Sequence, residues 1–81
     1  MMAREKAEKG LILLKEAILA FAALHPEGIT NAQVAVELGL ESDFEGNQQN
    51  YLSWSVIGLL VNEGKLRYEL RGRSRTYFEA A

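Results

Sequence analysis

The fold is decided by the stretch KLRYELRGRSRTYF, residues 65–78 of the 81-residue chain. Apolar and polar side chains alternate in its first half, which sets Leu66, Tyr68 and Leu70 against Arg67 and Glu69. Such alternation is typical of a half-exposed β-strand. A basic turn that contains glycine follows, and Thr76-Tyr77-Phe78 reads as a returning strand. The stretch therefore predicts a β-hairpin with a basic tip over about residues 65–79.

A long helix is expected before this hairpin, over about residues 47–63, with Gly64 as its stop signal. Its apolar stripe consists of Leu52, Val56, Leu59 and Leu60. The opposite side, by steps of about 100° per residue, carries Asn47, Tyr51, Trp54 and Gly58. Ile57 and Val61 make the second half apolar all round, so we expect that half to be buried.

A shorter helix is expected over about residues 31–38. Thr30 and Gln33 have the spacing of a capping box, and Ile29 and Val34 have that of a hydrophobic staple. Gly39 is the expected stop. The acidic residues 41–46 then form a turn longer than the three or four residues of a minimal helix-turn-helix, and its acids would repel phosphates.

A first helix is expected over about residues 3–24, because Leu11, Leu14, Ile18 and Phe21 follow helical spacing. The residue before Pro26 is disfavoured in the α conformation, which ends the helix. Ile12, Leu13 and Leu19 widen the apolar surface almost all round. Two interpretations stay open: the helix is covered by a second copy or a larger host assembly, or it is a core helix with scattered exposed leucines.

Length and composition indicate one globular domain, residues 1–81, without disulfides, because the chain is 48% hydrophobic and has no cysteine. The net charge of −2 is unevenly distributed. Residues 65–77 carry five basic side chains and one acid, a local +4, whereas residues 1–64 carry four and nine, a local −5. Since salt screens charges beyond about 8–10 Å, the local basic patch matters more to a phosphate than the total.

Several function classes are disfavoured. Lys15 and Glu16 interrupt the apolar run of residues 11–24, which is also shorter than the roughly 20 residues of a membrane span, so we expect a cytoplasmic protein with no membrane partner. We expect no enzyme: His25 beside Pro26 reads as a capping or surface residue. Asp43 and Glu45, a possible carboxylate pair, lie in a turn. We expect no cofactor and no metal, because no ligand spacing appears.

Residues 27–78 resemble the winged helix-turn-helix superfamily. The resemblance is carried by the capped segment of residues 28–40, by Leu59-Leu60-Val61-Asn62-Glu63-Gly64-Lys65-Leu66, and by the basic turn of residues 71–77. It implies a mainly α fold with a small β-hairpin wing: a three-helix winged helix-turn-helix. In this family the start of helix 3 usually enters the major groove and the wing contacts phosphates or a flanking groove. The long acidic turn departs from the commonest pattern.

The resemblance and the residue types together give a set of candidate DNA contacts. At the start of helix 3 these are Asn47, Gln48 and Asn50, whose amides can pair with adenine in the major groove; the alternative is that Asn47 is an N-cap and the rest a solvated turn. Tyr51 and Trp54 either contact the nucleic acid or pack beneath the wing. The other candidates are Arg67, Arg71, Arg73 and Arg75 of the wing, with Thr30 at the start of helix 2; for these the alternatives are a solvated turn and a cap.

The expected function is sequence-preferring binding of double-stranded DNA by a small winged-helix protein, as a transcriptional regulator or DNA-targeting module. The expected partners are the duplex and a second copy bound through helix 1, or a larger host assembly. The alternative is a winged-helix protein-interaction or dimerisation module that does not bind DNA, which the acidic total favours. A third possibility is that the chain is a fragment whose catalytic part lies elsewhere.

Overall fold

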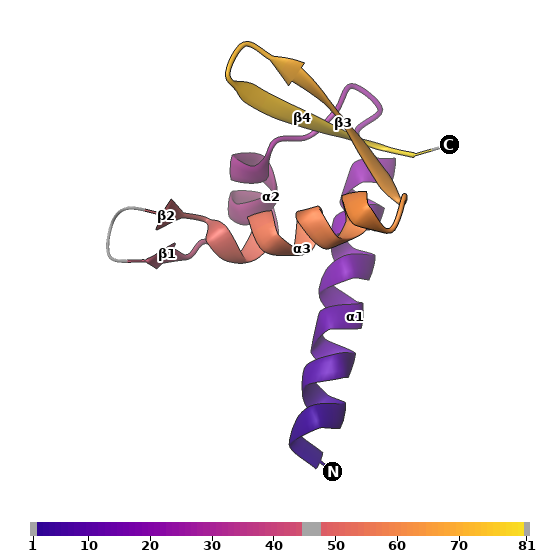
Figure 1. Ribbon diagram of the computed structural model, residues 1–81, viewed down its shortest axis with the longest axis vertical. Helices are drawn as coiled ribbons and strands as arrows, with labels where there is room; N and C mark the ends of the chain where they lie inside the picture. Colours follow the sequence, from indigo (N-terminus) through magenta and orange to yellow (C-terminus); the bar gives the residue numbers. More distant parts are fainter. Residues whose placement is uncertain (1, 45–47, 81) are drawn as a thin grey trace.

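The computed structural model describes residues 2–44 and 48–80. These residues form three helices, α1 (Met2–Ala23), α2 (Asn31–Glu37) and α3 (Tyr51–Asn62). They also form two antiparallel hairpins: β1 (Asp43–Phe44) pairs with β2 (Gln48–Gln49), and β3 (Leu66–Arg71) pairs with β4 (Ser74–Glu79). In Figure 1, α3 lies across the middle, with α2 and the β3–β4 hairpin on one side of it. α1 crosses α3 and runs out on the other side. The expected mainly helical architecture with a β-hairpin is confirmed.

The core lies where α1, α2, α3 and the β3–β4 hairpin meet. The helices contribute most of its side chains, and one residue comes from each of β3, β4 and the segment before α2: Ile18, Ala22, Ile29, Val34, Val56, Ile57, Leu60, Leu66 and Tyr77. Burying apolar area stabilises the folded chain by about 25 cal/mol per Å². The same hydrophobic cluster therefore holds α2, α3 and the β3–β4 hairpin in place relative to one another.

The segment before α2 is tied to β4. Ile29 and Tyr77 exchange both backbone hydrogen bonds, at 2.9 and 2.7 Å. Gly28 has a φ of +102°, and a Cβ there would lie 2.4 Å from Cγ2 of Thr76. Glycine is therefore required at this position both by the backbone conformation and by the close approach to β4. The contact places the start of α2 beside the hairpin.

The start of α2 follows its sequence signals. Thr30 is extended, its Oγ1 accepts a hydrogen bond from Gln33 N at 3.2 Å, and Gln33 Oε1 accepts one from Thr30 N at 2.8 Å. The predicted capping box is thereby confirmed. The helix ends at Glu37, one residue before the predicted end.

The start of α3 differs from the prediction. The helix begins at Tyr51 and not at about residue 47, because Gln48 and Gln49 pair with Phe44 and Asp43 in a strand. Asn50 follows with a φ of 58°, a left-handed conformation that asparagine tolerates better than most residues. The capping oxygen is supplied from a distance: Ser42 Oγ accepts a hydrogen bond from Leu52 N at 3.1 Å. Asn47, which was the N-cap in the alternative interpretation, lies outside the described residues.

The buried face of α3 is rotated by about one residue from the predicted stripe. Ser53, Val56, Ile57 and Leu60 are buried, whereas Leu52 and Leu59 are 38% and 40% exposed. The prediction that the second half is buried all round is therefore wrong for Gly58 and Leu59. The reason lies in tertiary contacts, since Ser53 makes a polar contact with α2 that removes the cost of burying its hydroxyl.

α1 is longer than the body that it packs on. Its buried residues are Ile18 and Ala22, and Leu11, Leu14 and Phe21 pack partly against the core. Residues 2–9 are all exposed, and this leading half projects from the molecule in Figure 1. Ile12 and Leu13 are 54% and 64% exposed. Across the described residues, no helix combines the length and apolar character that a bilayer crossing requires.

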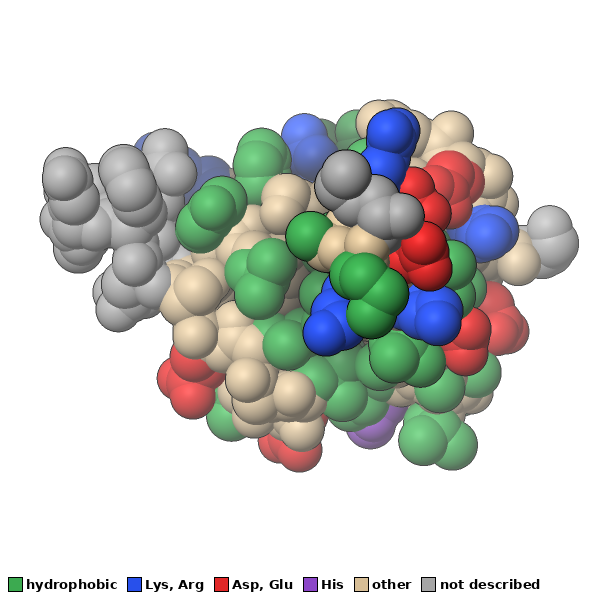
Figure 2. Space-filling model, turned by 90° about the horizontal axis from the view of Figure 1, so that it is seen from below, with side chains coloured by type: hydrophobic (Ala, Val, Ile, Leu, Met, Phe, Trp, Pro, Cys, Tyr) green, Lys and Arg blue, Asp and Glu red, His purple; other side chains and the backbone are tan. Residues whose placement is uncertain are grey.

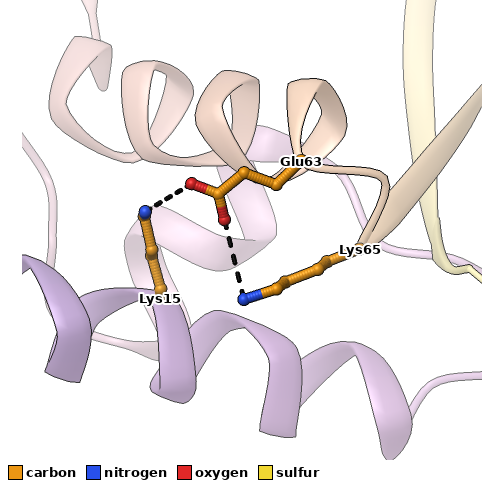
Figure 3. Close-up of polar contacts among 3 residues, drawn as sticks. All are labelled: Lys15, Glu63 and Lys65. Carbon is orange, nitrogen blue, oxygen red and sulfur yellow. Dashed lines mark hydrogen bonds and ion pairs between the residues drawn. The ribbon is translucent and has the colours of Figure 1, made fainter.

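An ion pair fixes α1 against the end of α3. Lys15 Nζ lies 2.5 Å from Glu63 Oε2, and Lys65 Nζ lies 3.7 Å from Glu63 Oε1 (Figure 3). The hydrogen bond from Lys15 is the main reason that the pKa of Glu63 is lowered; the charges of Lys15 and Lys65 act in the same direction, and partial burial opposes them. These three residues connect α1, the end of α3 and the start of β3.

Candidate nucleic-acid interface

A groove opens where the start of α2, the exposed side of α3 and the tip of the β3–β4 hairpin converge. Its volume is about 580 Å³, and the residues that line it come from all three elements: Thr30, Asn31, Ala32, Trp54, Arg73, Ser74, Arg75 and Tyr77. Trp54, the α3 residue in this set, is 56% exposed. An arginine-bearing hairpin tip and an aromatic helix face thus border one concave surface.

A second hollow of about 280 Å³ continues the groove along α3. It is lined by Trp54, Gly58, Val61, Asn62, Tyr68, Arg75 and Tyr77. Because Trp54, Arg75 and Tyr77 border both hollows, we treat them together as the α3–hairpin groove. The described residues that line it include two arginines and no carboxylate. The groove therefore has the charge and the aromatic surface that suit an anionic ligand.

Strand alternation decides which hairpin residues face the groove. Residues paired across the two strands share a face, so Tyr68 lies with its partner Tyr77, and Leu70 with its partner Arg75. The guanidinium of Arg75 lies 4.5 Å from the ring centroid of Tyr68, a cation–π contact. This contact holds Arg75 on the groove side of the hairpin.

The opposite face of the hairpin holds Arg67 and Arg71. Arg67 Nη1 lies 3.1 Å from Glu69 Oε2, and Arg71 Nη2 lies 3.9 Å from Glu69 Oε1. Both guanidinium groups also lie over the ring of Phe78, at 4.4 and 5.5 Å from its centroid. The carboxylate of Glu69 thus offsets part of the positive charge that Arg67 and Arg71 place on this face.

The predicted basic tip is therefore divided. Arg73 and Arg75 line the groove, whereas Arg67 and Arg71 lie on the other face of the strands with Glu69. The four wing arginines named as candidates therefore do not lie on one face of the hairpin, because every second residue shares a face only while the strand continues. The turn at Gly72 and Arg73 reverses the chain, so that Arg71 pairs with Ser74 and Arg75 with Leu70.

The amide-rich stretch is only partly brought to this surface. Asn47 lies outside the described residues, and the structure describes the backbone of Gln48 but not its side chain. Asn50 is half-buried, and its carbonyl oxygen accepts a hydrogen bond from Asn31 Nδ2 at 3.1 Å. The backbone of Asn50 therefore has a structural role at the junction of α2 and α3.

A buried polar junction positions α3 against α2, and sequence reasoning missed it. Ser53 Oγ lies 2.6 Å from Asn31 Oδ1 and 3.0 Å from the carbonyl oxygen of Asn50. Ser53 is fully buried. The signal was present in its spacing, because Ser53 lies three, four and seven residues before Val56, Ile57 and Leu60. A serine within an apolar helical stripe indicates a partner on another element.

The outward face of α3 is exposed at Tyr51 and Trp54, and Gly58 is exposed as well, although the second half of this helix was expected to be buried. The helix Tyr51–Asn62 contains no charged residue. Thr30 lies on the groove wall, with its hydroxyl engaged in the cap of α2. Of the candidates, Thr30, Trp54, Arg73 and Arg75 are thus brought together, and Arg67 and Arg71 are not.

His25 is half-buried beside Phe21, with ring centroids 4.4 Å apart, and its Nδ1 lies 3.0 Å from Glu27 Oε2. The pKa of Glu27 is lowered, first by a hydrogen bond to its own backbone and then by His25. Within residues 2–44 and 48–80, no three histidine, cysteine or acidic side chains gather as a metal site. Comparison with protein-family models, curated proteins and solved structures gave no match for this chain.

Proposed function

We propose that this chain is a winged helix-turn-helix protein that binds double-stranded DNA, with α3 as the recognition helix and the β3–β4 hairpin as the wing. The observation that carries the proposal is the shared groove: Arg73 and Arg75 of the hairpin border the same concave surface as Trp54 of α3 and Thr30 of α2. Basic and aromatic groups from separate elements converge on one side, as a duplex requires.

The dimensions of the elements support this proposal. α3 has 12 residues, so it is about 18 Å long and about 10–12 Å wide with side chains. The major groove of B-DNA is about 12 Å wide and admits a helix of this width. A hairpin tip beside such a helix reaches the adjacent phosphates or minor groove with its arginines.

The charge distribution sets the expected strength and salt dependence. Because α3 has no charged residue, phosphate attraction comes chiefly from Arg73 and Arg75. Two phosphate contacts give a slope of log K against log salt of about −1.8, so a fourfold rise in salt weakens binding roughly 12-fold. Sequence preference would come from hydrogen bonds and apolar contacts of the outward α3 residues. The proposed role is regulation of transcription or targeting of DNA in the cytoplasm.

The test is fluorescence anisotropy with a labelled duplex of mixed sequence, titrated at several salt concentrations. Arg73→Ala and Arg75→Ala should each weaken binding and reduce the salt slope by about 1. Arg67→Ala and Arg71→Ala remove the same charge from the other face and serve as matched controls with little effect. The proposed interface is refuted if the protein binds no duplex at low salt. It is also refuted if all four substitutions weaken duplex binding equally.

A second candidate function is self-association through α1, without DNA binding. It is favoured by the exposure of Ile12 and Leu13 on α1 and of Leu52 and Leu59 on α3. Hydrophobic side chains gather on the side of the molecule from which α1 projects (Figure 2). The leading half of α1 carries charges of both signs, so a second copy would not meet a block of like charge there.

The two functions are separated by measuring mass in solution. Multi-angle light scattering should give twice the chain mass if α1 pairs with a second copy. Leu13→Lys should then give a monomer, whereas Val36→Lys, which changes an equally exposed residue of α2, should not. A monomer at all concentrations excludes this candidate and leaves the DNA proposal unaffected.

A further inference from the structure

Gly58 lies in the middle of α3 without a structural reason to be glycine. Apart from proline, glycine is the least favourable residue in a helix interior. Gly58 is exposed, and a Cβ built on it would meet no atom within 4 Å. Gly28 is different, because there a Cβ would collide with Thr76. The fold of the free protein thus accepts alanine at residue 58.

The open space beside Gly58 is the α3–hairpin groove. Gly58 borders the groove one helical turn from Trp54 and one from Asn62. Tyr68 and Arg75 of the hairpin form the opposite wall. The missing side chain therefore widens the groove at its middle, where α3 and the hairpin approach each other.

The groove walls match the chemistry of a sugar–phosphate strand. Arg75, held at 4.5 Å over the ring of Tyr68, offers a positioned cation to a phosphate. Trp54 offers an aromatic surface to a sugar, and Asn62 offers an amide. In a duplex, each strand of the backbone separates a major from a minor groove. A protein with α3 in one groove and the hairpin tip at the next must therefore pass one strand between them.

We propose that Gly58 is a clearance position, which lets one backbone strand of a DNA duplex enter the groove between α3 and the hairpin. Arg75 binds a phosphate of that strand, and Trp54 packs against its sugar. This inference rests on the proposed function and adds to it the route of the strand and the residue that keeps the route open. The close approach of a ligand backbone is one of the uses of glycine.

The experiment compares Gly58→Ala with Gly10→Ala. Gly10 lies inside α1, and a Cβ there also meets no atom within 4 Å. Both substitutions should raise the melting temperature by roughly 3–8 °C, because alanine favours the helix. Duplex affinity, measured by anisotropy with a labelled 24-base-pair duplex of mixed sequence, should fall for Gly58→Ala alone. The expected loss is roughly 5- to 100-fold, as for an overpacked contact.

The outcomes separate this inference from the proposed function. If wild type, Gly10→Ala and Gly58→Ala bind the duplex equally, the clearance role is wrong and DNA binding stands. If the wild type binds no duplex, both proposals fall. A lower melting temperature for Gly58→Ala overturns the premise that the fold does not need this glycine. Tighter binding of the single strand than of the duplex overturns the proposed strand route.

Discussion

Ser53→Ala tests whether the buried polar junction holds α3 against α2. Ser53 is fully buried, and its Oγ lies 2.6 Å from Asn31 Oδ1. The substitution removes a hydrogen bond worth about 0.5–1.5 kcal/mol and leaves an acceptor on Asn31 without its donor, a further cost of about 1–3 kcal/mol when buried. Asn31 is only half-buried, which reduces the cost of leaving its acceptor unpaired. Alanine is also a better helix former than serine, which offsets part of the remaining loss.

The expected net loss is about 1–2 kcal/mol of unfolding free energy. For a domain of this size it corresponds to a fall in melting temperature of roughly 4–15 °C. The assay is urea unfolding followed by circular dichroism. The matched control is Ser55→Ala, since Ser55 Oγ donates a local hydrogen bond to the carbonyl of Leu52 at 2.9 Å and the residue is partly exposed. The control should be neutral or slightly stabilising.

A double-mutant cycle decides whether the effect belongs to the junction. Ser53→Ala and Asn31→Ala share a partner, so their combined loss should differ from the sum of the single losses by about 0.5 kcal/mol or more. Additive losses, or equal behaviour of the two serine variants, would refute the reasoning. Because Asn31 and Trp54 both line the groove, Ser53→Ala should also weaken the proposed duplex binding relative to the wild type.

Three further perturbations follow from the contacts described. Gly28→Ala should lower stability by about 2 kcal/mol or more in thermal unfolding, because a Cβ would lie 2.4 Å from Thr76 Cγ2 and φ is +102°; an unchanged melting temperature contradicts the close approach. In the same assay, Thr30→Ala should lower the free energy of unfolding by about 1 kcal/mol through loss of the N-cap, and Thr30→Ser should keep most of that stability. The lowered pKa of Glu63 gives stability that is present above pH 4.5 and is lost as the pH falls through the lowered value. Lys15→Met should therefore flatten the acid limb of a plot of melting temperature against pH, and an unchanged limb would show that the pair with Lys15 contributes nothing.

The sequence predicted those elements whose signals are local. The alternation of residues 66–70 and the capping box at Thr30 were sufficient for the β3–β4 hairpin and for α2, because both depend on neighbouring residues. The start of α3 was mispredicted because its cap comes from Ser42 through space. The spacing of apolar residues along a helix gives no information about such a contact with a residue that lies before the helix.

The candidate site was predictable in part for the same reason. Exposure of Trp54 followed from its angle on the helix. The division of the arginines did not follow from counting charges, because it depends on the register of the two strands and on Glu69. The buried face of α3 was displaced because Ser53 finds a partner on α2. The start and the buried face of α3 depend on polar contacts between elements, which the pattern of apolar residues along the chain does not predict.

The backbone pair between Ile29 and Tyr77 has a consequence for how the molecule is made. These residues are 48 positions apart by subtraction of their numbers, so the chain must close a long loop before the pair can form, and such closure is slow relative to local helix formation. During synthesis, the helices emerge before β4 exists, and Ile29 has no strand to join. A nascent chain that stops before residue 77 should therefore hold helical segments without the completed α3–hairpin groove, and that groove should form only once the last strand has been made.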